Sequence, residues 1–466
     1  MAALLGASVF AAAGCGSDEP KTPGASDNGA QTGAARNVIF FLGDGMGMTT
    51  LTAARIYALG EDGALTLDTL PETAFVKTYS NDAQVTDSAP SMSAYMTGVK
   101  TNNEVISMTP DTKAIEPSAS LTGNCGANNG KPVPTLLEIA KAKGLATGVV
   151  TTTRVTHATP AATYAHVCHR DAENDIAAQL VPGGAGYNAA LGDGVDVLMG
   201  GGRNHWTPYD PFANRRGRAD GRNLLAELQA KGYAVVATKD QLAQAGAGKL
   251  IGLFSTTSHL EYELDRVAGK GEGATQPSLA EMTAKAIDVL RKNPNGYFLM
   301  VEGGRIDHAL HGTNAKRALE DTVAFDEAIR TVLAKVDLSD TLIVVTADHD
   351  HTMTINGYSK RGNPVLDISR NYRDGQPNKD ADGNPYTTLV FGNGANRPNV
   401  RVPVDSSTAT NDAYLQEVGV RMGSTGSETH GGGDVMLFAD GAGAKAFKGT
   451  LDNTKVFGLV KAAFGF

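Results

Sequence analysis

The chain has 466 residues, of which 41% are hydrophobic, so it is long enough to bury a sizeable core in one large α/β domain. Its formal net charge of −9 excludes a general nucleic-acid-binding protein, because such proteins need a positive surface to neutralise phosphates. Basic residues are scattered apart from Arg-Arg-Gly-Arg at 215–218, which we interpret as part of a solvated loop.

The amino-terminal segment predicts export. Residues 2–14 are small and apolar and Cys15 follows directly, as at the end of a bacterial lipoprotein signal, although the usual basic region before the apolar stretch is missing. The stretch is short for a membrane span. We expect residues 1–15 to be a signal segment with lipid on Cys15, and residues 16–36, rich in Gly, Ser, Asp, Pro and Ala, to be a flexible tether. The mature protein would then be periplasmic or membrane-anchored.

Strand-like and helix-like segments alternate along residues 37–466. Apolar runs typical of buried parallel strands lie at 37–43, 146–153, 195–201, 296–303 and 341–348. Helical spacing is found at 134–144, 223–232, 279–293 and 314–336. This alternation predicts a doubly wound, mostly parallel sheet with helices on both faces, in a single catalytic domain. Residues 356–404, rich in Asn, Gly, Asp and Pro, interrupt it as a small loop-rich subdomain.

Several chemically active side chains follow the ends of these strands. Asp44, Thr159, Glu302 and Asp348 lie at or just beyond strand ends. Because ligands bind at the carboxyl ends of strands in open parallel sheets, we expect these four to lie together.

Metal-ligand types occur at fitting spacings. Asp307 and His311 are four residues apart, hence on one face of a helix, and His430 in a Gly-rich loop can supply a third ligand. Asp348 and His349 are adjacent at a strand end and can both reach one cation. Asp44 is followed by Gly-Met-Gly, and we prefer a metal ligand there to a nucleotide-binding loop, because its carboxylate would repel a pyrophosphate.

Ser88 is a candidate nucleophile. It lies at or near the amino-terminal cap of a predicted helix, in Thr-Asp-Ser-Ala-Pro-Ser, so it either caps that helix or attacks a substrate held at the positive helix end. Asp87 beside it would orient a cationic group. Arg170 offers a planar fork for two phosphate oxygens.

The remaining cysteines are Cys125 and Cys168. An exported chain tends to pair its thiols, which predicts a disulfide, the alternative being two free thiols.

Together these segments resemble the alkaline phosphatases over nearly all of residues 37–466. The resemblance is carried by VTDSAPSMSAYMTGVKT, VEGGRIDHALHG and TADHDHT, in the order of that family. It implies a phosphomonoesterase with two zinc ions and one magnesium, and a doubly wound fold that is often dimeric.

The resemblance also implies roles for individual residues. Ser88 matches the nucleophile that becomes phosphoserine, and Arg170 the phosphate-binding arginine. The zinc ligands are implied to be Asp307, His311 and His430 at one ion, and Asp44, Asp348 and His349 at the other. Asp44 also bridges to the third metal, whose other protein ligands match Thr159 and Glu302.

Two neighbouring histidines depart from part of the family. The best-studied bacterial members carry Asp and Lys where this chain has His157 and His308, whereas animal members carry His at both. Imidazole favours zinc over magnesium more than carboxylate does, so the third metal is left open between the two.

The residues also leave other functions open. A phosphodiesterase usually has a Thr nucleophile, and a sulfatase needs an Arg after its nucleophile that Ser88 lacks. A phosphate- or metal-binding lipoprotein without turnover is the non-enzymatic alternative. The expected substrates are small phosphomonoesters, and no nucleic-acid binding is expected.

Overall fold

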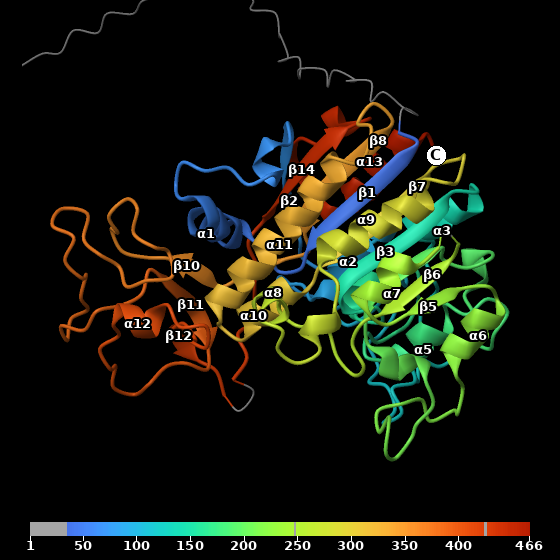
Figure 1. Cartoon of the computed structure of the whole chain (residues 1–466), viewed down its shortest axis with the longest axis horizontal. Coiled ribbons are helices and arrows are strands. Elements are labelled where there is room, and N and C mark those ends of the chain that lie inside the picture. Colours follow the sequence, from blue (N-terminus) through green and yellow to red (C-terminus); the bar gives the residue numbers. More distant parts are fainter. Residues whose placement is uncertain (1–34, 247, 424–425) are drawn as a thin grey trace, which may run out of the picture.

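The structure is a computed structural model that describes residues 35–246, 248–423 and 426–466. The expected signal segment, Cys15 and all of the tether except residues 35 and 36 lie outside the described residues. Figure 1 shows a large central sheet with helices on both faces, which confirms the predicted fold class. No helix in the described ranges has both the length and the apolar character needed to cross a membrane.

Ten strands form the main sheet, in the order β15-β2-β14-β8-β1-β7-β3-β4-β6-β5. β14 is antiparallel to β8 and β2, and the other neighbouring pairs of this sheet are parallel. The five predicted strands occupy the adjacent positions β8-β1-β7-β3-β4. The bounds are β1 Asn37–Gly43, β2 Glu72–Lys77, β3 Ala146–Arg154, β4 Val197–Gly201, β5 Ala234–Val236, β6 Leu250–Leu253, β7 Tyr297–Gly303, β8 Thr341–Ala347, β14 Val435–Gly441 and β15 Gly449–Asp452.

Helices cover the two faces of this sheet. α9 and α11 pack on one face, with α1 against α11, while α2, α3 and α13 pack on the other. The bounds are α1 Met48–Leu59, α2 Ser88–Thr97, α3 Leu136–Ala142, α4 Ala158–Ala161, α5 Glu173–Ala178, α6 Leu224–Ala230, α7 Lys239–Gln244, α8 Glu263–Val267, α9 Leu279–Leu290, α10 Arg305–His311, α11 Ala315–Leu333, α12 Ser406–Ala409 and α13 Asn453–Phe464.

α9 illustrates how the sequence sets a helix. Ser278 and Glu281 form a capping box that satisfies two backbone N–H groups at its start. Its buried side chains then recur at three and four residues, for example Leu279, Met282 and Ala286, which turns one face toward β3 and β7.

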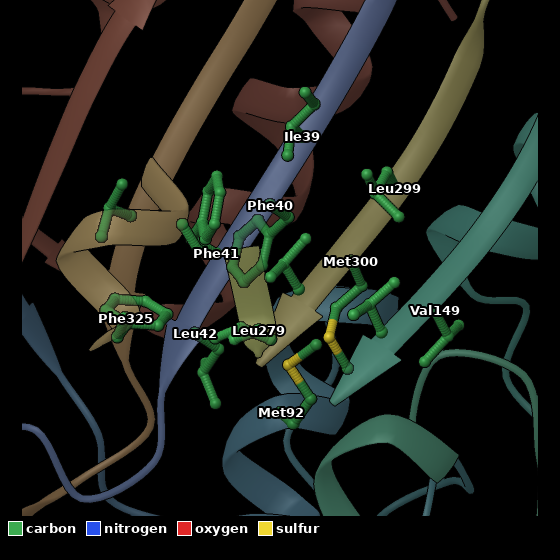
Figure 2. Close-up of a cluster of buried hydrophobic side chains, with 14 of the residues drawn as sticks. Ile39, Phe40, Phe41, Leu42, Met92, Val149, Leu279, Leu299, Met300 and Phe325 are labelled. Carbon is green, nitrogen blue, oxygen red and sulfur yellow. The ribbon is translucent and has the colours of Figure 1, made fainter. Parts of the chain in front are cut away.

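The central strand β1 is buried on both faces. Phe41 packs edge-on against Phe325 of α11, with ring centroids 5.7 Å apart, whereas Phe40 packs against Tyr95 of α2 at 5.6 Å. Figure 2 shows Phe40, Phe41 and Phe325 near apolar side chains of β7 and β3. Burial of each such side chain contributes roughly 2–3 kcal/mol to the free energy of unfolding. The packing of β1 therefore fixes the position of Asp44, which follows it.

Two smaller sheets complete the fold. β10 (Met353–Ile355), β11 (Leu389–Gly394) and β12 (Val418–Arg421) form one of them, beside the irregular chain of the loop-rich segment that projects from the main body in Figure 1. β9 (Asp350–His351) pairs with β13 (His430–Gly431), and this pairing sets His351 directly opposite His430.

The predicted disulfide is confirmed. Cys125 and Cys168 are bonded, with Cα atoms 5.6 Å apart. The bond ties the loop before α3 to the segment that carries Arg170.

Candidate active site

Asp44 and Asp348 directly follow the ends of β1 and β8, and both are fully buried. The N–H of Gly45 donates to Oδ1 of Asp348 at 2.9 Å, which joins the two strand ends. Gly45 has φ +66°, and a Cβ there would lie 2.5 Å from the His351 ring, so this turn requires glycine.

A first group of ligand atoms forms around these carboxylates. Nε2 of His349 lies 3.4 Å from Oδ1 of Asp44 and 3.3 Å from Oδ2 of Asp348. Nδ1 of His349 donates its proton to the backbone carbonyl of Asp350 at 3.1 Å, so the Nε2 lone pair faces the carboxylates. Oδ2 of Asp348 is buried without a hydrogen-bond partner in the described structure. Three acceptors therefore converge where a cation would satisfy them.

A second group forms around Asp307 and His311, one turn apart on α10. Nδ1 of His311 donates to the carbonyl of Glu428 at 2.6 Å, and Nδ1 of His430 donates to the carbonyl of Thr86 at 2.8 Å. Both Nε2 atoms are left unprotonated, yet they lie 3.1 Å apart and 3.4 and 3.5 Å from Oδ1 of Asp307. Facing lone pairs repel, so this arrangement also calls for a cation.

A third group shares Asp44. Oγ1 of Thr159, on the short helix α4, lies 3.4 Å from Oδ2 of Asp44. Glu302 is the penultimate residue of β7. Its Oε2 accepts hydrogen bonds from the hydroxyls of Thr151 and Thr153, whereas Oε1 is buried without a partner in the described structure. The donors here are oxygens, the kind that Mg²⁺ prefers.

The electrostatics support cation binding. Burial, together with the charges of Asp307 and Glu302, raises the pKa of Asp44 well above its usual range. Burial raises the pKa of Glu302 to about 8, and burial with the charge of Asp44 raises that of Asp348 to about 7. These carboxylates cannot all be ionised near neutral pH unless cations neutralise them. The ligand types and their burial thus fit metal ions.

Ser88 is the first residue of α2, and Asp87, not Ser88, caps that helix by accepting from the N–H of Ala89 at 2.7 Å. Oγ of Ser88 is free of the capping role and lies 3.4 Å from Oδ1 of Asp44 and 3.3 Å from Nε2 of His349. Asp87 also accepts from NH1 of Arg170 at 3.0 Å, which brings the guanidinium beside the start of α2.

His157 and His308 lie near the third group. A third imidazole, that of His259, packs against both of their rings. The ring centroids lie 5.3 Å apart for His157 and His308, 5.2 Å for His157 and His259, and 4.2 Å for His259 and His308. Burial and the neighbouring Arg170 lower the pKa of His157 well below its usual value, and burial with Arg305 lowers that of His308 to about 3. Both rings are therefore neutral.

The structure adds residues that the sequence reasoning missed. Nε2 of His351 donates to Oδ1 of Asp307 at 2.8 Å, and its Nδ1 donates to Oε2 of Glu428. With both nitrogens donating, His351 orients Asp307 instead of offering a lone pair. His351 could have been found from the sequence, because it follows His349 by two residues, and in an extended segment such residues lie on the same side of the chain. No comparable pattern marks Glu428 or His259.

The chain is similar to known phosphatases over nearly its whole length. A model of the alkaline phosphatase family matches residues 35–466. The alkaline phosphatase of Gadus morhua is 38% identical, covering 89% of this chain and 88% of the relative, and the tissue-nonspecific isozyme of Homo sapiens is 36% identical, covering 91% and 83%. Among solved structures, alkaline phosphatase from Thermus thermophilus is 28% identical with a TM-score of 0.68, covering 95% of each chain.

A second solved structure is a histidine-to-aspartate variant of alkaline phosphatase from the Antarctic bacterium TAB5, described with magnesium bound in a site called M3. It is 25% identical with a TM-score of 0.65, covering 94% of this chain and 99% of that one. The fold and the match to a family of metal-dependent phosphomonoesterases agree with the buried ligand groups. The chain therefore belongs to the alkaline phosphatase family and is an enzyme that hydrolyses phosphate monoesters.

Proposed function

We propose that hydrolysis proceeds through a phosphoserine on Ser88 and releases an alcohol and inorganic phosphate. The observation that carries this proposal is the position of Oγ of Ser88. It lies within 3.4 Å of Asp44 and His349, at the start of α2, with Arg170 held beside it through Asp87. A hydroxyl with this set of neighbours fits a nucleophile better than a helix cap, a role that Asp87 already fills.

We propose that three cations complete the site. Asp307, His311 and His430 would hold one zinc ion, and Asp44, Asp348 and His349 a second. Asp44, Thr159 and Glu302 would hold magnesium, a choice supported by the oxygen donors of these three residues and by the magnesium described in the TAB5 variant. When bound, such cations neutralise the carboxylates and lower the pKa of nearby hydroxyl groups.

The residues of the chain then have separate tasks. Ser88 gives up its proton and attacks phosphorus in line, the P–O bond to the leaving alcohol breaks, and the alcohol oxygen takes up a proton. Arg170 binds two non-bridging oxygens with its guanidinium, and Asp87 fixes its orientation. Water then attacks the phosphoserine from the vacated side, and Ser88 leaves and regains a proton. The backbone N–H groups at the start of α2 add positive potential for the phosphoryl group.

Hydrolysis of a phosphate monoester and of a diester by the wild type and two serine variants tests this mechanism. We expect fast hydrolysis of p-nitrophenyl phosphate and negligible hydrolysis of bis-p-nitrophenyl phosphate at alkaline pH with zinc and magnesium. Ser88→Ala should lower the monoester rate by about 10³-fold or more, whereas the control Ser91→Ala, on the same helix, should stay within about tenfold of wild type. A dominant diester rate would instead assign the chain to the diesterases, and a Ser88→Ala variant with wild-type turnover would refute the nucleophile.

We further propose that the protein is exported and carried on a lipid attached to Cys15. The Cys125–Cys168 disulfide supports an oxidising compartment. Cell fractionation with Cys15→Ala tests the anchor: the variant should move from the membrane fraction to the soluble extract. Equal partitioning of both proteins would contradict lipid attachment.

A homodimer is proposed from the family resemblance alone. Light scattering on the purified protein should give twice the mass of the chain, and a monomer mass would end this proposal.

A further inference from the structure

A cavity of about 750 Å³ lies at the carboxyl end of β3, beside the start of α5. We name it the arginine cavity and define it by Arg154, Glu173, Asn204, Tyr209, Arg215 and Arg216. Arg154 ends β3, Glu173 begins α5, and the two other arginines come from the loop after β4. Its volume is in the range of small-molecule sites.

The lining of this cavity is net positive. Three arginines face one carboxylate, that of Glu173, and no other acidic side chain lines the described cavity. The charge of Glu173 is already engaged, because it accepts from Nε of Arg154 at 2.8 Å and from Oγ1 of Thr156 at 2.5 Å. Arg215 and Arg216 therefore supply positive charge that no carboxylate of the cavity neutralises.

These two arginines also have free hydrogen-bonding capacity. In the described structure the guanidinium of Arg216 makes no hydrogen bond or ion pair, and that of Arg215 makes one contact, to the carbonyl of Pro211. The basic cluster of the sequence is thus only partly a solvated loop: Arg218 is buried, donates to the carbonyl of Asn174 at 2.6 Å, and holds the loop in place. Asn204 is 3% exposed, and its Oδ1 has no partner there either. That oxygen can only accept a hydrogen bond, so the unused donors of the wall are the guanidinium groups of Arg215 and Arg216, on a loop anchored by Arg218.

The cavity and the phosphate-binding arginine are linked by direct contacts. NH1 of Arg154 lies 2.6 Å from Nε2 of His259, whose ring packs on His157. Nε2 of His157 in turn accepts from NH2 of Arg170 at 3.1 Å. Glu173 also follows Arg170 by three residues. Two imidazoles, those of His259 and His157, therefore lie between the cavity and Arg170, and a substrate that occupies both places must extend past these rings.

We propose that the arginine cavity binds a second anionic group, a phosphate, on the leaving group of the substrate. This inference rests on the proposed function at Ser88 and names a preferred substrate class, organic bisphosphates. Arginine guanidinium groups pair with phosphate oxygens in two-point contacts, and Arg215 and Arg216 are the unpaired donors available for them.

A series of α,ω-alkanediol bisphosphates of increasing chain length tests the proposal, each compared with its monophosphate. The measured quantity is kcat/KM for loss of the first phosphate, at low ionic strength, divided by the value for the monophosphate. In wild type this ratio should rise at one chain length that spans the two sites. In Arg215→Ala/Arg216→Ala that gain should fall by about tenfold, because two partly screened contacts are lost.

Matched variants separate this effect from others. Arg361→Ala/Arg373→Ala removes the same charge from the projecting loop-rich segment, away from α5 in Figure 1, and should keep the wild-type ratio. Arg215→Lys/Arg216→Lys should keep part of the gain. Hydrolysis of p-nitrophenyl phosphate should stay within about twofold in all of them, so a failure of the catalytic proposal would be seen separately.

Two results would overturn the inference. One is a bisphosphate ratio that does not depend on chain length, or that is equal in wild type and in the Arg215→Ala/Arg216→Ala variant. The other is a second equivalent of inorganic phosphate, bound through these arginines in calorimetry, without any preference for bisphosphates. The latter would assign the cavity to a free anion.

Discussion

Two groups of three histidines lie at the same edge of the sheet, yet their hydrogen bonds give them opposite properties. His311, His349 and His430 each donate Nδ1–H to a backbone carbonyl, which leaves Nε2 unprotonated and facing carboxylates. His157, His259 and His308 each lie with one nitrogen against an arginine, at 3.1, 2.6 and 3.0 Å. An arginine can only donate, so it occupies the lone pair of His157 and that of His308. The one lone pair of neutral His259 faces donors of Arg154 alone, the backbone N–H at Nδ1 and the guanidinium at Nε2.

From this difference we infer that the second hydrogen bond of a histidine decides whether it can serve as a metal ligand. Carbonyl partners prepare the first group for cations. Burial, with the charge of neighbouring arginines, lowers the pKa of each member of the second group. Burial lowers the pKa of the first group as well, so the hydrogen-bond partners distinguish the two groups and the charge state does not. Residue type alone would rank all six equally, and proximity to carboxylates would group His157 with the first three.

Removing one imidazole from each group should break this comparison most visibly. We expect His430→Ala to lose a metal ion and to lower kcat/KM by about 10³-fold, because Asp307 and His311 alone hold zinc poorly. His259→Ala should keep the wild-type metal content and stay within about tenfold in kcat/KM. Elemental analysis of the purified proteins and p-nitrophenyl phosphate kinetics measure both. Equal metal loss in the two variants would contradict the distinction.

A smaller loss of zinc affinity is expected from a residue that only orients a proposed ligand. His351→Asn removes the donor that orients Asp307, and we expect zinc affinity to fall by about 10- to 100-fold. Competition with a coloured chelator measures this affinity. His166→Asn is a matched control, because that histidine also has both nitrogens bonded, to Ser107 and Glu138, but touches no ligand group. Unchanged zinc affinity in His351→Asn would show that Asp307 is oriented without it.

Much of this arrangement was predictable from the sequence. The parallel strands have uninterrupted apolar runs, so the edge where Asp44 and Asp348 meet followed from the rule that ligands gather at the carboxyl ends of strands. The spacing of Asp307 and His311 predicted a shared helix face, and α10 bears it out. These features are local in sequence or follow from general sheet topology.

Other features depended on long-range pairing that no local pattern encodes. β9 and β13 are two residues long each, yet their pairing brings His351 opposite His430. Glu428, just before β13, then bonds His351 through its carboxylate and His311 through its backbone carbonyl. His259 lies in an irregular loop after β6. The capping role of Asp87 also escaped prediction, since Asp and Ser are equally good caps and the choice between them depends on where the helix begins.

Metal removal should make stability depend on pH in a definite direction. Folding raises the pKa of Glu302 to about 8 and of Asp348 to about 7, mainly through burial. Such groups favour folding in their protonated form, so in metal-free protein this contribution is complete below about pH 4 and is lost as pH rises toward 8. We expect the melting temperature of chelator-treated protein to fall between pH 6 and 9, relative to protein reloaded with zinc and magnesium. Parallel curves for the two would contradict this coupling.

The smallest effect is expected on magnesium retention, when His157 of the arginine-bonded histidine group is replaced by a carboxylate. His157 lies in one cluster with Asp44 and Glu302, but its Nε2 accepts from Arg170, so its proton is on Nδ1 and no lone pair of the ring is free for a cation there. His157→Asp would add a carboxylate oxygen there, and carboxylate favours magnesium where imidazole favours zinc. We expect a several-fold slower loss of magnesium on dialysis, measured by elemental analysis. His259→Asp introduces the same charge beside Arg154, outside that group, and should leave magnesium retention unchanged. If both variants retained magnesium equally, added negative charge would explain the result, and the position of the arginine-bonded histidine would not matter.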